Sequence, residues 1–471
     1  MRKQPFIAAL MLTTFLGGCN MIPEYLRPAS PVAAAWPSGA AYQAPAELAA
    51  KSAVETGWQE FFRSQNLQRL IGAALENNRD LRVAALNVEA ARAAYRVQRA
   101  ELVPSVQAGT GMSRQGVPEN ASSTGRDAIS SQYTANVATT AFELDVFGRI
   151  RSLNEKALQD YLATDEARKS VQIALVAEVA NAYLSLLADE KLLKLTEETL
   201  AAQQESFTLI ERSFDAGIGS QLDVSQARTS VETARTNLAQ YKRRVAQDKN
   251  ALALLVGAAD VTVDTANETL DDTLIMENLP AGLPSDVLLN RPDVLQAEYT
   301  LKGANANIGA ARAAFFPRIS LTGSLGLASS SLSDLFKSGS GLAWSFAPQL
   351  TVPIFEGGAN VANLELAETQ QKIAVASYEK AIQTAFREVA DELAARGTYS
   401  DQLQAQSALV GATQNAYDLS QLRYKQGVDS YLNVLDAQRS LYSAQQGEIQ
   451  VQQQRLSNLV TLYKTLGGGL K

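Results

Sequence analysis

The sequence of 471 residues contains no histidine and only one cysteine. Without histidine the chain has no Ser–His–Asp triad, no imidazole base and no histidine-ligated metal site. A single cysteine allows neither an intrachain disulfide nor a cysteine-based zinc site. These absences argue against an enzyme, and we expect neither a bound metal nor a catalytic cofactor.

Positive charge is also scarce, because 42 Lys and Arg residues face 49 Asp and Glu residues and leave a formal net charge of −7. Nucleic-acid binding requires clustered basic side chains, so we expect no nucleic acid as a partner. Hydrophobic residues make up 46% of the chain, which is typical of a globular protein. The length alone favours two or three ordinary domains.

The N-terminus predicts a signal peptide over residues 1–18 that ends in a lipid attachment site. Arg2 and Lys3 precede an apolar run over 6–16, which is too short to cross a bilayer as a helix. Leu16-Gly17-Gly18-Cys19 resembles the bacterial lipobox, in which Cys19 receives a diacylglycerol and an N-acyl chain. An ordinary signal peptide with an incidental cysteine is the alternative. Removal of 1–18 takes the net charge to −9, and Asn20 favours sorting to the outer membrane.

No later stretch predicts a transmembrane helix, so a chain that crosses a membrane must do so with strands of a closed barrel. Four segments alternate apolar and polar residues over lengths that suit tilted spanning strands. They are residues 103–115, 130–145, 317–329 and 341–354. A soluble sheet with one wet face gives the same alternation, but the lipoprotein signal favours an outer-membrane sheet. Four strands cannot close a barrel, so several chains must contribute.

The body of the chain contains an internal repeat. Asn77–Asp80 opens a segment that Asn290–Asp293 opens again 213 residues later. An Ala-rich pair of helical segments can mimic such similarity, but matched Pro, Phe and Gly positions argue against chance. We expect repeat 1 at 65–257 and repeat 2 at 285–467. The matched positions are Pro104 with Pro317, Phe147 with Phe355, Gly217 with Gly427, and Gly257 with Gly467.

Each repeat contains one very long helix followed by a return helix. Residues 149–216 contain neither Gly nor Pro, which predicts a helix of roughly 100 Å. Residues 359–426 contain no Pro and predict its counterpart. Glycine at 217 and 427 ends each long helix, and serine at 220 and 430 caps the next one, over 220–256 and 430–466. Helices of this length predict an elongated bundle, a coiled coil or a tube.

Taken together, these features resemble the TolC-like family of outer-membrane efflux proteins, and within it the lipidated OprM-type branch that serves RND pumps. The resemblance covers nearly the whole mature chain. The residues that carry it are Leu16–Cys19, Arg79-Asp80, Pro292-Asp293, Phe142–Gly148, Phe315–Pro317, Tyr424–Asp429 and Leu435–Gln438.

This resemblance implies an α+β membrane protein that is a homotrimer. Three chains of four strands form a 12-stranded barrel in the outer membrane, continued by an α-helical barrel in the periplasm. An equatorial belt is built from 19–64, 258–284 and the C-terminal tail 468–471. The implied function is the exit duct of a tripartite multidrug or solvent efflux pump, with a periplasmic adaptor and an inner-membrane RND-type transporter as partners.

The resemblance also implies a gate at the periplasmic end. Leu432 and Asp436 match the pore-ring positions and, spaced i and i+4, share one helix face. For Asp436 the alternative is an ordinary solvated carboxylate.

In the family, polar links between neighbouring hairpins hold this gate closed. The matching positions in this sequence are Asp223 and Tyr424, and Arg423 is a substitute partner. Asp223 is equally suited to cap the helix that follows Ser220. The best-known relatives carry arginine at Asp429 and aspartate at Asn433, so the links differ here in detail. The tips Gly217, Ser220, Gly427 and Ser430 match the adaptor-docking surface.

Two other classes of function compete with the duct. A lipid-anchored periplasmic stalk or adhesin explains the long helices and the anchor, but not the paired strand segments. A periplasmic enzyme would need acid–base groups such as Asp271-Asp272, which lie in a polar linker.

Overall fold

The computed structural model describes residues 19–42, 53–121, 125–258, 287–337 and 341–471, with parts of 259–286. The signal peptide therefore lies outside the described residues. The chain folds into two compact units. The first comprises Asn87–Thr164, Gln296–Tyr378 and the N-terminal residues up to Pro28. The second comprises Ala29–Leu86, Asp165–Leu295 and Glu379–Lys471. Both units draw on both repeats, so they are not successive domains of the kind that the length suggested.

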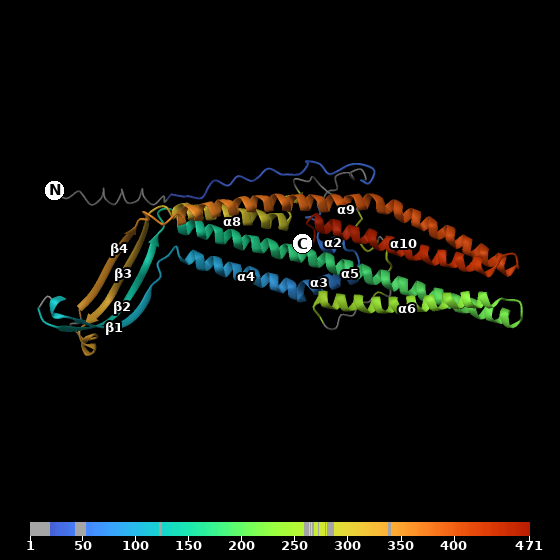
Figure 1. Cartoon of the computed structure of the whole chain (residues 1–471), viewed down its shortest axis with the longest axis horizontal. Helices are drawn as coiled ribbons and strands as arrows, with labels where there is room; N and C mark the ends of the chain where they lie inside the picture. Colours follow the sequence, from blue (N-terminus) through green and yellow to red (C-terminus); the bar gives the residue numbers. More distant parts are fainter. Residues whose placement is uncertain are drawn as a thin grey trace. The chain divides into compact units, whose positions relative to one another are not determined.

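The first unit contains a four-stranded antiparallel sheet (Figure 1). Its strands are β1 (Gln107–Val117), β2 (Ala128–Leu144), β3 (Arg318–Ser329) and β4 (Gly341–Thr351), in the order β1-β2-β3-β4. The two strands of each repeat are neighbours, and β2 pairs with β3 to join the repeats. The order leaves β1 and β4 at the edges of the sheet.

The register gives this sheet one apolar and one polar face, as the alternation predicted. Val137 lies opposite Leu325, and Leu325 lies opposite Trp344. On the other face Ser324 lies opposite Ser345, and their hydroxyls are 2.7 Å apart. Trp344 is 73% exposed, so the apolar face is uncovered in the single chain. A large uncovered apolar surface of this kind indicates contact with lipid or with another protein.

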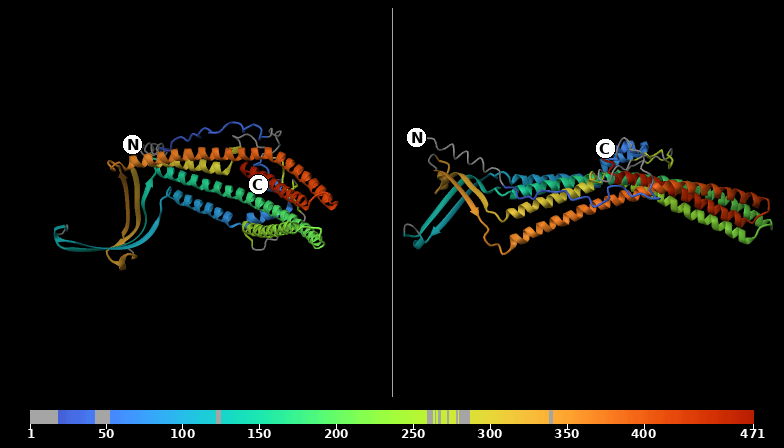
Figure 2. Two further views of the ribbon diagram at one scale, coloured as in Figure 1. Left: turned by 45° about the vertical axis from the view of Figure 1, so that its right-hand side comes forward. Right: turned by 90° about the horizontal axis from the view of Figure 1, so that it is seen from above.

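Long helices make up most of the remaining chain. They include α4 (Arg79–Ala100), α5 (Arg149–Asp215), α8 (Pro292–Ala313) and α9 (Ala359–Lys425). In the second unit, α6 (Gln221–Val256) returns along α5, and α10 (Tyr431–Thr465) returns along α9 (Figure 2). The two 67-residue helices α5 and α9 confirm the expectation drawn from the scarcity of Gly and Pro. Short elements are α2 (Trp58–Phe61), α3 (Gln65–Asn77), η1 (Glu119–Ala121) and η2 (Leu332–Asp334).

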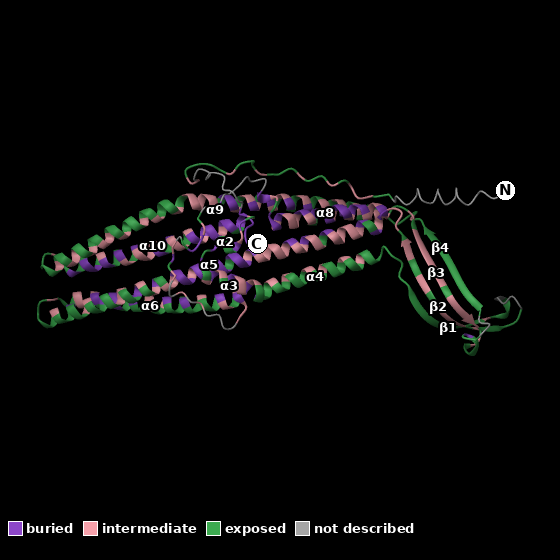
Figure 3. Cartoon of the chain, turned by 180° about the vertical axis from the view of Figure 1, so that it is seen from behind, coloured by how far each residue is buried: buried purple, intermediate pink, exposed green. Residues whose placement is uncertain are grey.

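The core of the second unit joins segments that are far apart in the sequence. Phe61 stacks on Tyr463 with ring centroids 4.0 Å apart, and both rings are almost fully buried. The backbone N–H of Met276 donates to Phe61, and that of Trp58 donates to the terminal residue Lys471. The N-terminal segment, the linker and the C-terminus therefore meet, as the resemblance implied for the belt. Figure 3 shows the buried residues concentrated around α2, α3 and α10 in this unit.

One window of 18 residues within α5 is apolar enough to cross a membrane by length and composition alone. This window was not singled out from the sequence, and a single window of this kind is weak evidence for a membrane-spanning helix. Most of that window is buried inside the protein, as in the core helix of a soluble domain. Val179, Tyr183 and Leu186 of α5, for example, are completely buried. The apolar composition of α5 is thus used for packing against other helices.

Candidate functional site

The two helical hairpins of the second unit end in turns of similar geometry. Gly217 has a φ of +76° and Gly427 a φ of +72°, a left-handed conformation that other residues rarely adopt. The N–H of Ile218 donates to the carbonyl of Ser213 over 3.0 Å, and that of Val428 donates to Arg423 over 2.9 Å. These bonds satisfy carbonyls at the ends of α5 and α9, as expected of a glycine-terminated helix.

The two return helices begin differently. Ser220 and Asp223 form a complete capping box, in which the Asp223 N–H donates to Ser220 Oγ over 3.2 Å. The carboxylate of Asp223 accepts from the N–H and the hydroxyl of Ser220 over 3.2 and 2.7 Å. Ser430 also occupies the cap position, but its side chain makes no capping bond. The predicted serine cap is therefore correct for α6 and wrong for α10, where Asn433 replaces the carboxylate at the third helical position.

Arg423 pairs with a residue of its own turn. Its Nε and Nη2 donate to the two carboxylate oxygens of Asp429 over 2.5 and 3.3 Å. This pairing holds the pKa of Asp429 below its usual value. The sequence identified Asp429 only as a departure from the family. The sequence could have predicted this ion pair, because Arg423 and Asp429 carry opposite charges and are six residues apart across a glycine turn.

Tyr424 lies in a small cluster of aromatic and aliphatic side chains. Its ring centroid is 5.5 Å from that of Tyr431. Tyr431 packs with Val434, Leu435, Ile210 and Ala227, which come from α10, α5 and α6. Burial raises the pKa of Tyr424, and the nearby charge of Asp223 raises it further. The structure therefore brings Tyr424 and Asp223 of one chain near each other, with Asp223 already engaged in the cap.

Leu432 and Asp436 lie on the face of α10 that points away from this cluster. Leu432 is 43% exposed, and the side chain of Asp436 is 63% exposed. The nearest cation to Asp436 is Arg439, whose Nη1 lies 3.7 Å from Oδ1. A leucine and a carboxylate one turn apart are thus both free to meet other molecules or other copies of the chain.

In the first unit, Cys19 lies at the start of α5, beside the end of β2. Its carbonyl accepts from Arg151 Nη2 over 3.3 Å. Gly148, with a φ of +78°, passes so close that an added Cβ would lie 2.8 Å from that carbonyl. The thiol belongs to a free, exposed cysteine. Cys19 is therefore accessible at the junction between strands and helices.

The segment that follows Cys19 is tied along α8. Asn305 donates to the carbonyl of Pro23 over 2.8 Å. Arg27 Nη2 binds both carboxylate oxygens of the buried Glu298 over 2.9 and 2.8 Å. Lys302 approaches the same carboxylate at 3.0 Å. Sequence reasoning missed this attachment, because nothing local marks residues that meet across so long a stretch of chain.

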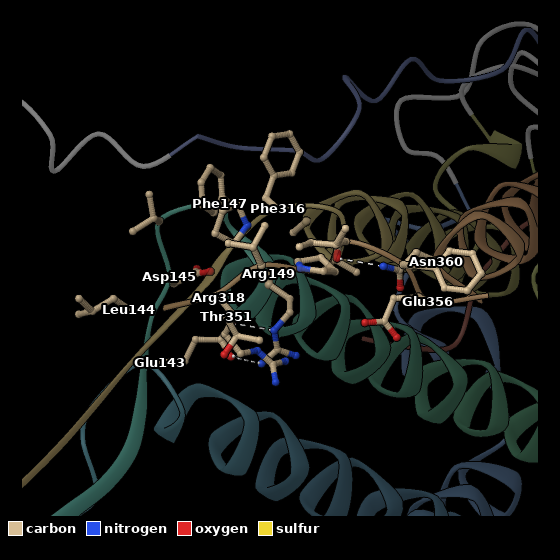
Figure 4. A pocket seen from close by; sticks show the side chains of 18 residues that line it. Glu143, Leu144, Asp145, Phe147, Arg149, Phe316, Arg318, Thr351, Glu356 and Asn360 are labelled. Atoms are coloured by element: carbon tan, nitrogen blue, oxygen red, sulfur yellow. Dashed lines mark hydrogen bonds and ion pairs between the residues drawn. The ribbon is translucent and has the colours of Figure 1, made fainter. Parts of the chain in front are cut away.

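A cavity of about 680 Å³ lies at the same junction of strands and helices (Figure 4). Within it, Glu143 at the end of β2 accepts from Arg149 of α5 over 2.8 Å and from Arg318 of β3 over 3.0 Å. Phe147 and Phe316 stack beside these charges, with centroids 4.9 Å apart. This cluster was not among the predicted functional residues.

Of the acidic pair considered for catalysis, Asp272 lies outside the described residues. Asp271 accepts from the N–H of Thr273 over 2.9 Å and from the hydroxyls of Thr269 and Thr273. Its hydrogen bonds lower the pKa of Asp271, which is the opposite of what a general acid at neutral pH needs. The carboxylate of Asp271 therefore accepts hydrogen bonds from within its own loop.

Comparison with known proteins gives matches over the full length of the chain. The family model "Outer membrane efflux protein" matches residues 70–258 and 283–468, one block in each repeat. The solvent efflux pump outer membrane protein SrpC of Pseudomonas putida is 54% identical, over 99% of this chain and 98% of its own. The antibiotic efflux pump outer membrane protein ArpC of Pseudomonas putida is 53% identical, over 98% and 95%.

A solved structure has the same fold. The MtrE outer membrane channel of Neisseria gonorrhoeae, in its open state, superposes with a TM-score of 0.86 at 41% identity. The match covers 96% of this chain and 99% of that one. The fold with four strands and long helices is therefore the TolC-like fold that the sequence resemblance implied.

Proposed function

This chain belongs to the outer membrane efflux protein family and is the outer-membrane channel of an efflux pump, and we propose that three identical copies form one exit duct. The four-stranded sheet supports this proposal, because it is too small to close alone and has edge strands β1 and β4 available for pairing. Joining β4 of one copy to β1 of the next places the apolar face in lipid and the polar face toward the lumen.

The proposed anchor is a diacylglycerol and an N-acyl chain on Cys19. Support comes from the lipobox and from the position of Cys19 where β2 ends and α5 begins. In a sheet that spans the bilayer, this end of the strands lies at the periplasmic surface. Acyl chains attached there would enter the inner leaflet of the outer membrane.

The proposed gate is formed by Leu432 and Asp436 from the three chains. Both are exposed in the single chain and share one face of α10, so three copies around one axis would bring them together as two stacked rings. A leucine ring excludes water by contact, and an aspartate ring attracts cations. The duct is thus closed at the periplasmic end until the pump assembles.

Asp223, Arg423 and Tyr424 are proposed to hold neighbouring hairpins together at this gate. The contacts within one chain favour a modified form of that link. Arg423 is held by Asp429, so the pair would act together, with the exposed guanidinium edge of Arg423 toward a neighbour. Asp223 would combine capping of α6 with proximity to Tyr424.

The tips that carry Gly217, Ser220, Gly427 and Ser430 are the proposed docking surface for a periplasmic adaptor, which connects the duct to an inner-membrane RND-type transporter. The relatives are named for solvent and antibiotic efflux, and we propose small toxic compounds of these classes as the substrates. The duct conducts them passively, since selection is made before they reach it.

Conductance of the purified trimer in planar bilayers tests the channel and its gate. We expect a small closed-state conductance that rises severalfold in Leu432→Ala and in Asp436→Ala, because each change opens one ring. Gln450→Ala, at an exposed position of α10 outside the predicted rings, is the matched control and should leave conductance unchanged. Closed-state conductance that stays at the wild-type level in both gate variants contradicts the gate assignment. A soluble monomer without conductance contradicts the duct itself.

A further inference from the structure

Charged residues are rare in the sheet, and the register sorts them between its faces. Among the described strand residues they are Arg114, Glu143 and Arg318. Arg114 lies opposite Ser131 on the face that carries Met112 and Tyr133. Glu143 lies opposite Ser320, and Arg318 lies opposite Thr351, on the polar face. All the charge on the polar face of the strands is therefore at the end next to the helices.

Within this cluster the carboxylate is covered and one guanidinium is open. The side chain of Glu143 is 14% exposed, because Arg149 and Arg318 bind it from two sides. The side chain of Arg149 is 28% exposed, whereas that of Arg318 is 56% exposed. A solute on the polar face therefore meets the guanidinium group of Arg318 rather than the carboxylate (Figure 4).

The surroundings leave the guanidinium group of Arg318 open to the polar face of the sheet. Arg318 is on β3, which lies between β2 and β4, so pairing of copies at the outer strands does not reach it. Two further carboxylates line the cavity. Asp145 caps α5 and pairs with Arg151 over 3.0 Å. Glu356 comes from the segment between β4 and α9.

We propose that Arg318 tunes the charge selectivity of the duct at the junction of strands and helices. This inference rests on the proposed trimer, in which three Arg318 side chains line the lumen. Their positive charge is opposite in sign to that of the proposed Asp436 ring. It is also opposite to the net charge of the whole chain, which is −7 with the signal peptide included. A ring of guanidinium groups lowers the local concentration of cations and raises that of anions. Arg318 therefore moderates the cation preference of an otherwise acidic duct.

The test is the reversal potential of the full-length trimer in a KCl gradient near 0.1 M, compared with Arg318→Gln. For three unit charges about one Debye length from the pore axis, the screened potential changes the local concentration of each ion about twofold, in opposite directions for K⁺ and Cl⁻. The K⁺/Cl⁻ permeability ratio should therefore rise about fourfold in the variant. Near 1 M salt the Debye length falls to about 3 Å, so the difference should vanish. Arg318→Lys keeps the charge and should keep the wild-type ratio.

Arg114→Gln is the matched control, because it removes the same charge from the apolar face and should leave the ratio unchanged. If Arg318→Gln does not assemble, Glu143→Gln supplies the second test. That variant exposes the guanidinium charge and should shift the ratio toward anions. Conducting channels with wild-type ratios in both variants overturn the inference and leave a structural ion pair. Failure of the wild-type protein to conduct contradicts the proposed function instead.

Discussion

An acidic pair in the second unit is the clearest titratable feature at the scale of single residues. Asp189 of α5 and Asp248 of α6 lie together, and one oxygen of Asp248 is buried without a hydrogen-bond partner. Arg244 Nη1 approaches Asp189 Oδ1 at 3.7 Å. Around them, Glu190 of α5 is bound by Lys249 of α6 at 3.0 Å. Burial and the charge of Asp189 raise the pKa of Asp248 to about 6.

This pair predicts that acid stabilises the contact between α5 and α6. A folded pKa of about 6, above the usual Asp value, means that the stabilisation is complete below pH 3.8 and is lost as the pH rises through 6. Asp248→Asn should remove this dependence and raise the melting temperature at pH 7.5 by about 1–2 °C. Thermal unfolding of trimers between pH 5 and 7.5 measures it. Parallel pH profiles for wild type and variant would contradict a raised pKa.

At the scale of elements, the side chain of Asp223 at the start of α6 has two roles that variants can distinguish. Asp223 completes the capping box with Ser220, and it is also a proposed link at the gate. Ser220→Ala removes the serine half of the box and should cost about 1 kcal/mol of local stability. Asp223→Ala removes the other half of the box and the gate link together.

We therefore expect increased hydrogen exchange at the start of α6 in both variants, but a raised closed-state conductance only in Asp223→Ala. Hydrogen exchange of the α6 amides and single-channel recording measure the two effects. Equal conductance in both variants would leave Asp223 with the capping role alone. Asn433→Ala at the equivalent position of α10 is a suitable control, because no capping box exists there.

At the scale of the whole molecule, the proposed duct has two independent attachments to the membrane, the acyl chains on Cys19 and the strands. Cys19→Ser removes the first and leaves the sheet unchanged. We expect the variant to lack the mass of the acyl chains and still to be recovered from outer membranes as a heat-modifiable trimer, because the apolar face of the sheet remains in lipid. Mass spectrometry and gel migration measure this. Recovery of the variant as a soluble periplasmic protein would show that the lipid is the main attachment.

Most of the secondary structure and the family were accessible from the sequence alone. The long helices follow from the scarcity of Gly and Pro in 149–216 and 359–426, and the strands follow from alternation with a period of two. These signals are local, since each residue need only agree with neighbours a few positions away. The gate and docking residues came from the resemblance, and they remain proposals.

The tertiary structure decided which residues that are distant in the chain come into contact. Arg27 binds Glu298 across 271 residues, and Glu143 at the end of a strand in one repeat binds Arg318 at the start of a strand in the other. It also assigned Asp223 to its cap and Arg423 to Asp429. The reason is physical. Helix and strand periodicity is set by bonds within a few residues, whereas an ion pair forms only where the folded chain brings two charges within about 4 Å, which no local pattern records. The absence of histidine and the single cysteine thus determined what chemistry this protein does not use, and the fold determined where its remaining charges meet.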